Sequence, residues 1–377
     1  MHVLRVQQFD QLFPYRKAWD DLANGCVFRS WDWLSTWWKH YGSLRPAQSL
    51  NVLLVLDGEH TTAESEQLLA ILPCYLDTSL TRGKVLRLLG DGEVCSDHLG
   101  LLIDPDSDPD SAHCVSAALA DYFVQTWTDW DLVDFSTVDA DDGALEHLSS
   151  ALESRDCHVS RSPGPNSWSA ELPSSWEEFL ALQSKSHRKQ IRRFEKRILN
   201  TGQGVWHLVQ TQQDFDLAWT ILVDLHQRRR ISLGEPGCFA SERWANFHRD
   251  VAQQLLQSGR LRLSWLELGG QPIAAEYHLA DHQTTFAYQG GIDPRRLDEE
   301  PGQLSTICTI QHAIAEGHLA FDLLRGDEPY KAHWRAAPRP TTNLQIVPPR
   351  HSSRWRFQAW NCLRSARKLT KELARNG

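Results

Sequence analysis

The feature that most constrains the fold of this chain is an order of structural elements that its sequence contains twice. In the second half, a strand pattern at 261–268 is followed by the turn pair Gly269-Gly270, two more strand patterns, a helix pattern and a last strand. The first half has the same order, from the strand pattern at 51–58 to the one at 130–136. The copies lie much further apart than solenoid repeats, so the sequence predicts two related domains of the α/β class with mixed sheets.

Chain length and one loop-like stretch indicate where these domains meet. At 377 residues the chain is longer than most single domains. The stretch PGPNS at 163–167 has the composition of a linker. We therefore expect an N-terminal domain over residues 1–165, a second domain over residues 166–348 and a tail over residues 349–377.

Apolar residues at helical spacing predict further helices. Between Gln11 and Tyr41 they predict two helices, with Ser30 as the N-cap of the second. The same spacing predicts helices at 176–198 and 214–230. The remaining predicted strands are at 67–76, 85–90, 272–280, 284–291 and 319–326. The remaining predicted helices are at 112–127 and 301–316, and Gly317 is the expected C-terminal cap of the second of these.

Charge and cysteine content exclude several kinds of protein. The net charge of −9 gives no reason to expect DNA as a partner. The eight cysteines are scattered singly and lack metal-ligand spacing, so we expect reduced thiols and no metal. The N-terminus has no long apolar segment of a secretory signal, and no apolar run reaches membrane-spanning length. We therefore expect a cytoplasmic protein.

The tail differs in composition from the rest of the chain. Beyond Pro349 it carries eight basic residues and one acid, Glu372, with Trp355, Phe357 and Trp360 among them. Such a segment predicts an amphipathic helix. Two placements fit: a helix docked on the acidic body through its aromatic face, or a contact with an anionic surface such as the inner face of a membrane, RNA or a protein complex.

The second copy also has the features of a phosphate site. A pair of strands that diverge, followed by a helix whose N-terminus points into the gap, can bind a pyrophosphate through backbone N–H groups and the helix dipole. Gly290, Gly291 and the helix start at Gly302 fit this arrangement. Arg295 and Arg296 could add contacts to phosphate. Glycine and proline before a helix also mark ordinary turns, which is the alternative.

Several segments of the second half together resemble a known family. They are HQRRRISLGEPGCF at 226–239, GGQPIAAEYHL at 269–279, AYQGGIDP at 287–294, the helix start at Pro301-Gly302, Gly317 and FDLLRGDEPYK at 321–331. The combination resembles GNAT-type acetyltransferases of the CelD cellulose-biosynthesis kind, which are related to the Fem aminoacyltransferases. The DGE turn at 57–59 and SDHLGLLID at 96–104 are similar to the first half of that family.

The resemblance implies a fold of two tandem GNAT-like acyltransferase domains. It also implies that the second domain binds the acyl donor, acetyl-CoA or another acyl-CoA, as a co-substrate. The residues that we assign to this cofactor are Gln289, Gly290, Gly291, Arg295, Arg296, Gly302 and Gln303.

Four residues are candidates for the transfer chemistry. Glu276 is the expected general base, because a carboxylate on a mostly apolar strand is desolvated and accepts protons more readily; a rim carboxylate paired with an arginine is the alternative. Tyr330 could protonate the leaving thiolate, and Lys331 could hold a phosphate or an acceptor carboxylate. Asp322 is either catalytic or paired with Lys331 or Arg325 to hold the turn.

A further set of residues is assigned to the acceptor. Arg188 and Arg192 lie in the basic run 185–197, which either holds a phosphorylated acceptor or forms a solvated helix face. His226 is expected at a helix end, where it either closes over the acceptor or interacts with the helix dipole. The remaining assigned residues are Arg229, Tyr288, Arg325, Asp327 and Trp334.

The sequence therefore predicts an enzyme that moves an acyl group, acetyl in the first instance, from acyl-CoA to an amine or hydroxyl. The expected acceptor is a small molecule or a glycan intermediate of an exopolysaccharide or cell-envelope pathway. Two alternatives remain: a Fem-like transferase that uses aminoacyl-tRNA, and a GNAT-like module that has lost catalysis and serves a polysaccharide-synthesis complex.

Overall fold

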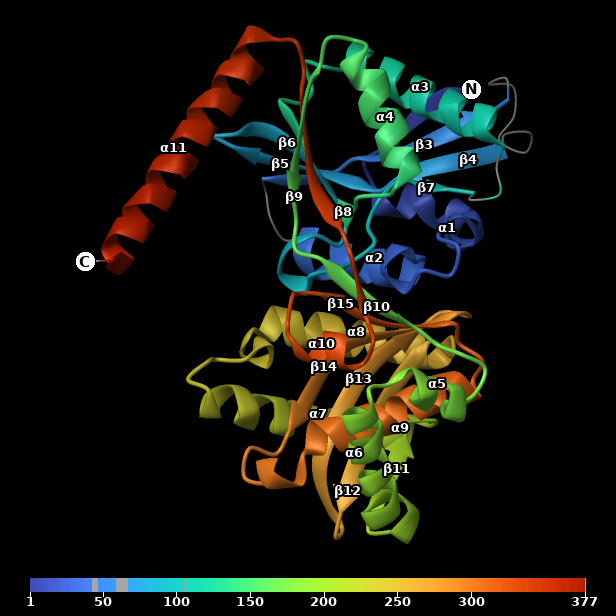
Figure 1. The fold of residues 1–377 in the computed structure, drawn as a ribbon. Coiled ribbons are helices and arrows are strands. Elements are labelled where there is room, and N and C mark those ends of the chain that lie inside the picture. The colour runs from blue at the N-terminus through green and yellow to red at the C-terminus, as the bar shows by residue number, and fades with distance from the viewer. Residues whose placement is uncertain (43–46, 59–66, 105, 107, 377) are drawn as a thin grey trace. The chain divides into compact units, whose positions relative to one another are not determined.

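The computed structural model describes residues 1–42, 47–58, 67–104, 106 and 108–376, and the chain forms two compact units (Figure 1). Unit 1 consists of Met1–Gly164 together with Pro340–Gly377, and unit 2 consists of Pro165–Arg339. The predicted turn after Asp57 lies mostly in 59–66, outside the described residues.

Unit 1 contains ten strands and five α-helices among the described residues. The strands are β1 (His2–Val6), β2 (Gln48–Leu50), β3 (Val52–Asp57), β4 (Gln67–Leu72), β5 (Cys74–Ser79), β6 (Gly83–Leu88), β7 (Leu102–Ile103), β8 (Leu132–Asp139), β9 (His158–Pro163) and β17 (Thr341–Val347). The helices are α1 (Arg16–Leu22), α2 (Trp31–Trp37), α3 (Pro109–Gln125), α4 (Gly143–Glu153) and α11 (His351–Asn376).

The strands of unit 1 form two sheets, and Pro73 separates them. The sheets have the orders β1-β3-β4-β7 and β2-β5-β6-β8-β17-β9. The sequence predicts strand structure over 67–76 as one run, but Pro73 cannot donate to a ladder, and β4 and β5 on its two sides pair in different sheets. Within the second sheet, β6 and β8 are parallel and pair at Val85–Leu132 and Leu86–Val133.

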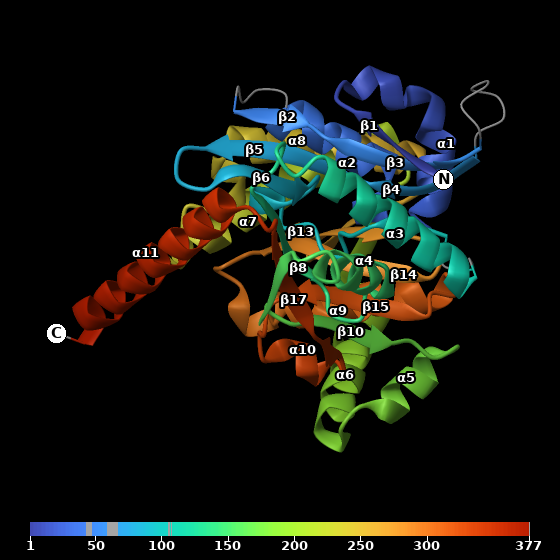
Figure 2. The same ribbon diagram turned by 90° about the horizontal axis from the view of Figure 1, so that it is seen from above.

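The helices of unit 1 cover its sheets. Figures 1 and 2 show α3 and α4 side by side, and α3 contacts β1 and β3. Ser30 caps α2 by accepting a hydrogen bond from the backbone N–H of Trp33, so the predicted N-cap is confirmed. Among the described residues, no helix has the length and apolar character needed to cross a membrane.

Unit 2 contains seven strands and six α-helices among its residues. The strands are β10 (Ser167–Glu171), β11 (Gly204–Leu208), β12 (Leu261–Leu268), β13 (Gln271–Ala280), β14 (Thr284–Ile292), β15 (Ala320–Arg325) and β16 (Ala337–Arg339). The helices are α5 (Trp176–Leu182), α6 (Lys185–Arg197), α7 (Gln212–Ser232), α8 (Glu242–Gln257), α9 (Pro301–Ala315) and α10 (Tyr330–His333).

All strands of unit 2 belong to one sheet of order β11-β12-β13-β14-β15-β10-β16. Neighbouring side chains of β13 point to opposite faces. Tyr277 contacts Trp219 of α7 on one face, whereas Ala274 belongs to the core that α9 forms with α5 and α6 on the other. Helices therefore cover both faces of this sheet.

Local predictions in unit 2 are confirmed at two turns and wrong at one helix. Gly269 and Gly270 both have positive φ, as the predicted hairpin requires. Gly317 has a φ of +81° and follows Glu316, the C-cap of α9, so it ends that helix as predicted. The predicted helix at 176–198 is divided into α5 and α6, because Gln183 is extended and Ser184 caps α6.

The structure corrects the second domain boundary. The first division falls after Gly164, one residue from the expected position. The expected second domain also included 340–348, but β17 lies between β8 and β9 in the second sheet of unit 1. The last strand of the chain thus returns to the first unit, and strand pairing over this distance leaves no local signal in the sequence.

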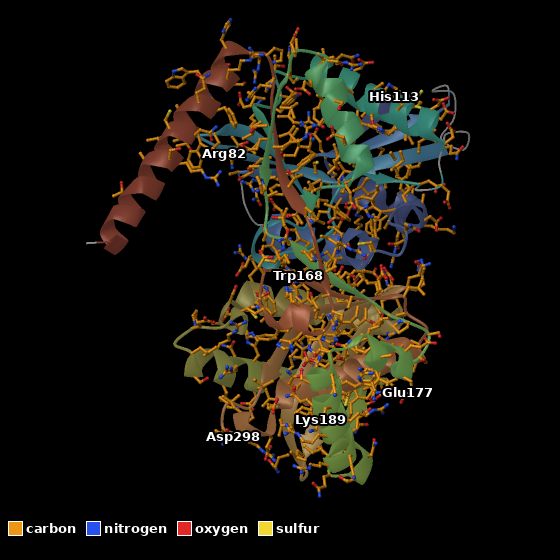
Figure 3. All side chains as sticks on the ribbon, in the orientation of Figure 1. Arg82, His113, Trp168, Glu177, Lys189 and Asp298 are labelled. Carbon is orange, nitrogen blue, oxygen red and sulfur yellow. The ribbon has the colours of Figure 1, made fainter. Side chains whose placement is uncertain are left out.

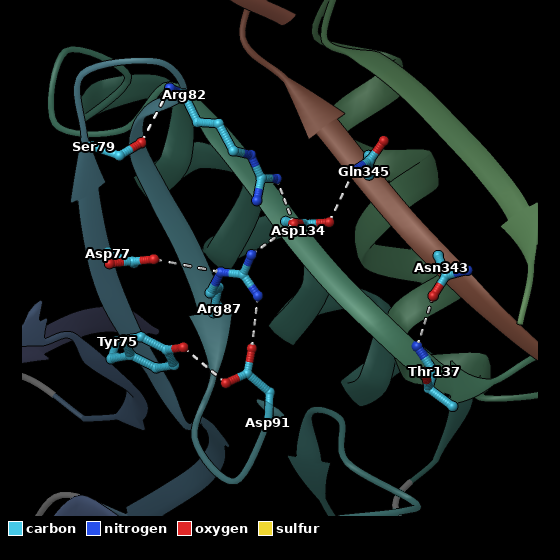
Figure 4. A network of polar contacts seen from close by, with 10 residues as sticks. All are labelled: Tyr75, Asp77, Ser79, Arg82, Arg87, Asp91, Asp134, Thr137, Asn343 and Gln345. Carbon is cyan, nitrogen blue, oxygen red and sulfur yellow. Dashed lines mark hydrogen bonds and ion pairs between the residues drawn. The ribbon is translucent and has the colours of Figure 1, made fainter. Parts of the chain in front are cut away.

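A network of charged residues bridges the strands of unit 1 (Figure 4). The Asp134 carboxylate of β8 contacts Arg82 and, at 3.3 Å, Arg87 of β6, and it accepts a hydrogen bond from Gln345 of β17. Arg87 also pairs with Asp91 at 3.0 Å. Burial alone would raise the pKa of Asp134, but the two guanidinium groups outweigh it and the pKa lies below its usual value.

Replacing Asp134 tests this network. We expect Asp134→Ala to lower the free energy of unfolding of unit 1 by about 3 kcal/mol, because it removes the carboxylate that the largely buried guanidinium groups of Arg82 and Arg87 share. The difference in the free energy of unfolding between wild type and variant should shrink in acid. A carboxylate whose pKa is lowered in the folded state stops stabilising the fold as the pH falls through that pKa. Urea unfolding measures both effects.

The matched control is Asp121→Ala. Asp121 pairs with Arg155 at the surface and its side chain is 59% exposed, so this change should cost less than about 1 kcal/mol. An equal loss in the two variants would contradict a stabilising role for the network.

Candidate functional site

The site is built around the point where β14 and β15 separate. The two strands are parallel and pair only at Thr284–Ala320, Thr285–Phe321 and Phe286–Asp322. Beyond these pairs β14 continues to Ile292, so its later residues have a free edge toward β15. The sequence predicted diverging strands in this region, and the structure contains them.

A β-bulge shapes the free part of β14. Across from β13, Tyr277 pairs with Gln289 and His278 pairs with Ala287, so Tyr288 is an extra residue. The Tyr288 hydroxyl lies 3.0 Å from Nε2 of His248 on α8, which fixes its ring beside the bulge. Bulges often re-aim side chains next to functional sites.

A cavity of ≈ 560 Å³ opens between the separated strands and the start of α9. Its lining combines charged, aromatic and apolar groups, as ligand sites commonly do. It is lined by Arg229, Glu276, His278, Ala287, Tyr288, Gln289, Gly290, Ile292, Gly302, Gln303, Thr306, Phe321, Leu323, Tyr330 and Trp334. Nine of the residues that the sequence assigned to catalysis, cofactor or acceptor are in this set.

Glu276 provides the carboxylate of the cavity. It pairs across the sheet with Gly290, and a Cβ on Gly290 would lie 2.5 Å from Oε2 of Glu276. Glycine at this position therefore leaves the room that the carboxylate occupies. Oε2 is 3.4 Å from Nε2 of His278, two residues along β13 on the same face. The partner of Glu276 in the cavity is thus a histidine, whereas the sequence alternative was an arginine.

Tyr330, the first residue of α10, provides a hydroxyl. About half of this side chain is exposed (51%). Burial of the hydroxyl raises the pKa of Tyr330 to about 12, and the negative charges of Glu328 and Glu276 add to the shift. The hydroxyl therefore stays protonated near neutral pH and acts as a donor. Trp334, buried at the end of the same short helix, forms another part of the wall.

The start of α9 forms one end of the cavity. A Cβ on Gly302 would contact only Ile292, at 4.0 Å, so the space at this turn is open to a ligand. Glu300, the residue before Pro301, has left-handed backbone angles. Its carboxylate accepts a hydrogen bond of 2.8 Å from Gln190 and lies 3.6 Å from Arg193, both on α6. These contacts place α6 beside the N-terminus of α9.

The exposed side of α6 is strongly basic. An open groove of ≈ 780 Å³ runs over this helix, lined by Ser186, Lys189, Gln190, Arg192, Arg193, Lys196 and Arg197. Figure 3 shows Lys189 on α6 and Glu177 on the neighbouring α5. Arg192 is held by Glu177 and Glu195, but Lys189, Lys196 and Arg197 form no ion pair with the residues that the structure describes. Arg188 is half-buried on the same helix.

Two of the four catalytic candidates hold the backbone at the end of β15. Lys331 is 2% exposed, and its Nζ donates to the carbonyl oxygens of Leu324, Arg325 and Gly326. It also pairs with Glu328 at 2.9 Å. Asp322 is buried and accepts a hydrogen bond of 2.7 Å from the N–H of Leu324. Neither residue lines the cavity, and the carboxylate that pairs with Lys331 is that of Glu328, whereas the sequence offered Asp322 as a partner for Lys331 or Arg325.

The remaining cofactor candidates contact protein groups. Arg295 pairs with Asp293, and Arg296 pairs with Glu299 and donates to the carbonyl oxygen of Leu268. Gly291 faces away from the cavity, because a Cβ there would lie 2.4 Å from the backbone nitrogen of His226 on α7. This glycine permits the close packing of α7 on β14.

Three acceptor candidates also lie outside the cavity lining. His226 is buried, and its ring contacts Phe239 and lies 3.4 Å from Sγ of Cys238. Because α7 continues to Ser232, His226 is not at the helix end, and burial lowers its pKa, which disfavours the charged form needed for a dipole interaction. Asp327 accepts hydrogen bonds from Asn166 and Trp168, and Arg325 supplies a carbonyl oxygen to Lys331.

The structure adds two polar residues that the sequence did not assign. His278 lies next to Glu276, and its signal was the alternation along β13. Thr306 lines the cavity one helical turn after Gly302 and donates its hydroxyl to the carbonyl oxygen of Gly302 at 2.7 Å. Thr306 follows Gly302 by four residues, and this helical spacing could have assigned it to the same face from the sequence.

Residues 185–332 match the family model described as an acetyltransferase (GNAT) domain. The match runs from the first residue of α6 into α10 and includes every residue of the cavity lining except Trp334. The chain thus contains a GNAT domain in unit 2, and the resemblance to GNAT acetyltransferases of the CelD type is confirmed. No curated protein sequence is significantly similar to this chain.

Solved structures share the fold over nearly the whole chain at low sequence identity. A crystal structure of FemX has a TM-score of 0.63 and 9% identity, and the match covers 93% of this chain and 98% of that chain. A conserved protein of unknown function from Bacteroides thetaiotaomicron has a TM-score of 0.54 and 12% identity, over 89% of this chain and 97% of that one.

A third structure is the C-terminal domain of a putative lysylphosphatidylglycerol synthetase from Agrobacterium fabrum. It has a TM-score of 0.50 and 9% identity, over 92% of this chain and 96% of that one. These similarities concern the fold. They confirm the predicted fold class, mixed α/β with two tandem GNAT-like domains, and this fold is shared with the FemX structure.

The two adjacent glycines of β14 allow a direct test of this geometry. We expect Gly291→Ala to lower the free energy of unfolding by about 1–3 kcal/mol, because the added methyl meets helix backbone that cannot move aside. Gly290→Ala should cost less than about 1 kcal/mol, because the methyl meets the end of the Glu276 side chain, which can rotate. Thermal and urea unfolding of both variants measure the difference, and the opposite order would contradict the assigned faces.

Proposed function

We propose that unit 2 transfers an acyl group, acetyl in the first instance, from a CoA thioester to an amine or hydroxyl. The observation that carries this proposal is the joining of three features in one cavity: the free edge of β14, the start of α9, and the polar groups of Glu276 and Tyr330. Since CoA thioesters are intracellular metabolites, we place the reaction in the cytoplasm.

The donor fits along the strand edge. Backbone groups of β14 beyond Phe286 can hydrogen-bond the amides of a pantetheine arm, as an extended peptide would. The pyrophosphate would then meet the open turn at Gly302 and the N-terminal dipole of α9. Gln303 and Thr306, one turn further along, line the same end of the cavity.

The polar groups of the cavity suit acyl transfer. The acceptor attacks the thioester carbon, a new C–N or C–O bond forms, and the C–S bond breaks. Glu276 takes the proton that the acceptor loses, and His278 holds its carboxylate in place. Tyr330 donates a proton to the leaving thiolate, and its raised pKa keeps that proton available.

Aromatic walls support a sugar or amino-sugar acceptor. Tyr288, Phe321 and Trp334 are among the residues that line the cavity, and aromatic residues commonly pack against the apolar faces of sugars. We therefore propose that the acceptor is a small molecule or a glycan intermediate of an exopolysaccharide or cell-envelope pathway.

The second candidate function is Fem-like aminoacyl transfer from aminoacyl-tRNA. The unpaired cations of α6 favour it, because a basic helix beside the cavity could bind a polyanionic donor. The fold shared with FemX is consistent with this alternative. The same cations could instead contact the phosphates of CoA, so the donor has to be tested.

Donor binding separates the two candidates. We expect acetyl-CoA to raise the thermal unfolding temperature, by an amount equivalent to about 2.7 kcal/mol when its concentration is a hundred times Kd. Uncharged tRNA should give no stabilisation at matched concentration and moderate salt. Stabilisation by tRNA with none by CoA would reject acyl-CoA as the donor in favour of the Fem-like function.

Glu276→Gln tests the general base. It should lower kcat by about 10²–10⁴ and leave the Kd for acetyl-CoA unchanged, because the amide keeps the shape of the side chain but cannot accept the proton. A suitable assay follows release of free CoA thiol with a panel of amines and amino sugars. Turnover equal to the wild type would remove Glu276 from the mechanism.

Tyr330→Phe tests the proton donor through its pH dependence. We expect a loss in kcat of about tenfold or more, with pH profiles of variant and wild type parallel below about pH 11. The reason is that a hydroxyl with a pKa of about 12 stays protonated throughout that range. A kcat of the Tyr330→Phe variant equal to that of the wild type would contradict this assignment.

A further inference from the structure

The C-terminal helix α11 docks on unit 1 through one face. Ser353 donates to Asp131 at 2.7 Å, and Phe357 packs on His158 and on the cluster of Val85, Leu132 and Val347. One turn later the guanidinium of Arg82 lies over the ring of Trp360 at 5.5 Å. Residues 353, 357 and 360 follow helical spacing, so they define a single docked face.

A second face of α11 is apolar and open to solvent. Trp355 is 71% exposed and Leu363 is 53% exposed, and Cys362 and Ala366 between and after them are exposed as well. At 3.6 residues per turn, this stripe points about 140° away from the docked face. The docking of α11 on unit 1 therefore cannot cover it. Figures 1 and 2 show the helix extending beyond the strands of unit 1.

Basic residues accompany this stripe. Arg354 and Arg356 lie on its two sides, and their guanidinium groups donate to the carbonyl oxygens of Asp156 and Leu80. Arg364 is exposed. The segment 350–377 contains eight basic residues and one acid, a net charge of +7, so the rest of the chain carries −9 − 7 = −16. The helix is thus strongly basic on an acidic protein.

We propose that α11 binds the surface of an anionic lipid membrane through this stripe, with the flanking arginines at the headgroups. A helix with an apolar strip, an interfacial tryptophan and basic flanks has the composition of a helix that lies in the membrane surface. Pairing of two copies through the same stripe is disfavoured, because it would bring two segments of charge +7 together. This inference does not depend on the reaction in unit 2.

Co-sedimentation of the full chain with vesicles tests the proposal. We expect binding to vesicles of phosphatidylcholine and phosphatidylglycerol in equal amounts, little binding to phosphatidylcholine alone, and weaker binding as salt rises. Trp355→Ser with Leu363→Ser should lower the partition coefficient at least about tenfold.

The matched control is Leu182→Ser with Leu217→Ser, which removes two leucines of similar exposure from α5 and α7. This variant should sediment like the wild type, and all variants should keep the wild-type unfolding temperature because the changed residues are exposed. The proposal is overturned if the wild type does not bind the anionic vesicles, or if the stripe variant binds them equally well. A wild-type dimer that the stripe variant dissociates, without vesicle binding, would replace the lipid with a second copy of the chain.

Discussion

The proposed chemistry of this protein depends on where one ladder of backbone hydrogen bonds ends. β14 and β15 pair over three residues, and the first residues beyond the ladder are Ala287 and Leu323, both on the cavity wall. Small and apolar side chains at this point neither bridge the gap nor need partners across it. The edge of β14 is therefore left for a ligand, and α9, which connects the two strands, begins at the far end of the same gap.

Unit 1 has the same parallel junction but fills it. β6 and β8 pair at two positions, and the first residues beyond them are Arg87 and Asp134, which form an ion pair at 3.3 Å. Tyr75, Asp91 and Gln345 extend that network over the neighbouring strands (Figure 4). The connecting helix α3 begins with Asp108 as its cap, an acid where a phosphate would need a free N-terminus. Among the described residues, the free strand edge and open helix start on which the proposed donor site depends therefore occur together in unit 2, whereas the corresponding junction of unit 1 is filled.

Much of this organisation could be predicted from the sequence, because local chemistry determines it. The repeat, the Gly269-Gly270 turn, the cap at Ser30 and the helix end at Gly317 follow from turn and capping preferences that act over a few residues. The return of β17 to unit 1 could not be predicted, since its partners are nearly two hundred residues away. The bulge at Tyr288 was hidden for a related reason: it is a property of the pairing with β13 and not of either strand alone.

The segment FDLLRGDEPYKAHW at 321–334 contains residues with two different roles: some hold the backbone of the turn, and others line the cavity. Asp322 binds the N–H of Leu324, whose φ is +58°, and Lys331 gathers three carbonyl oxygens of the turn. A buried ammonium with these partners fixes the start of α10 against the end of β15. Tyr330 and Trp334, the neighbours of this clamp, then reach the cavity wall. Asp322 and Lys331, the two charged catalytic candidates of this segment, thus hold the backbone, and by doing so they position the aromatic residues that line the cavity.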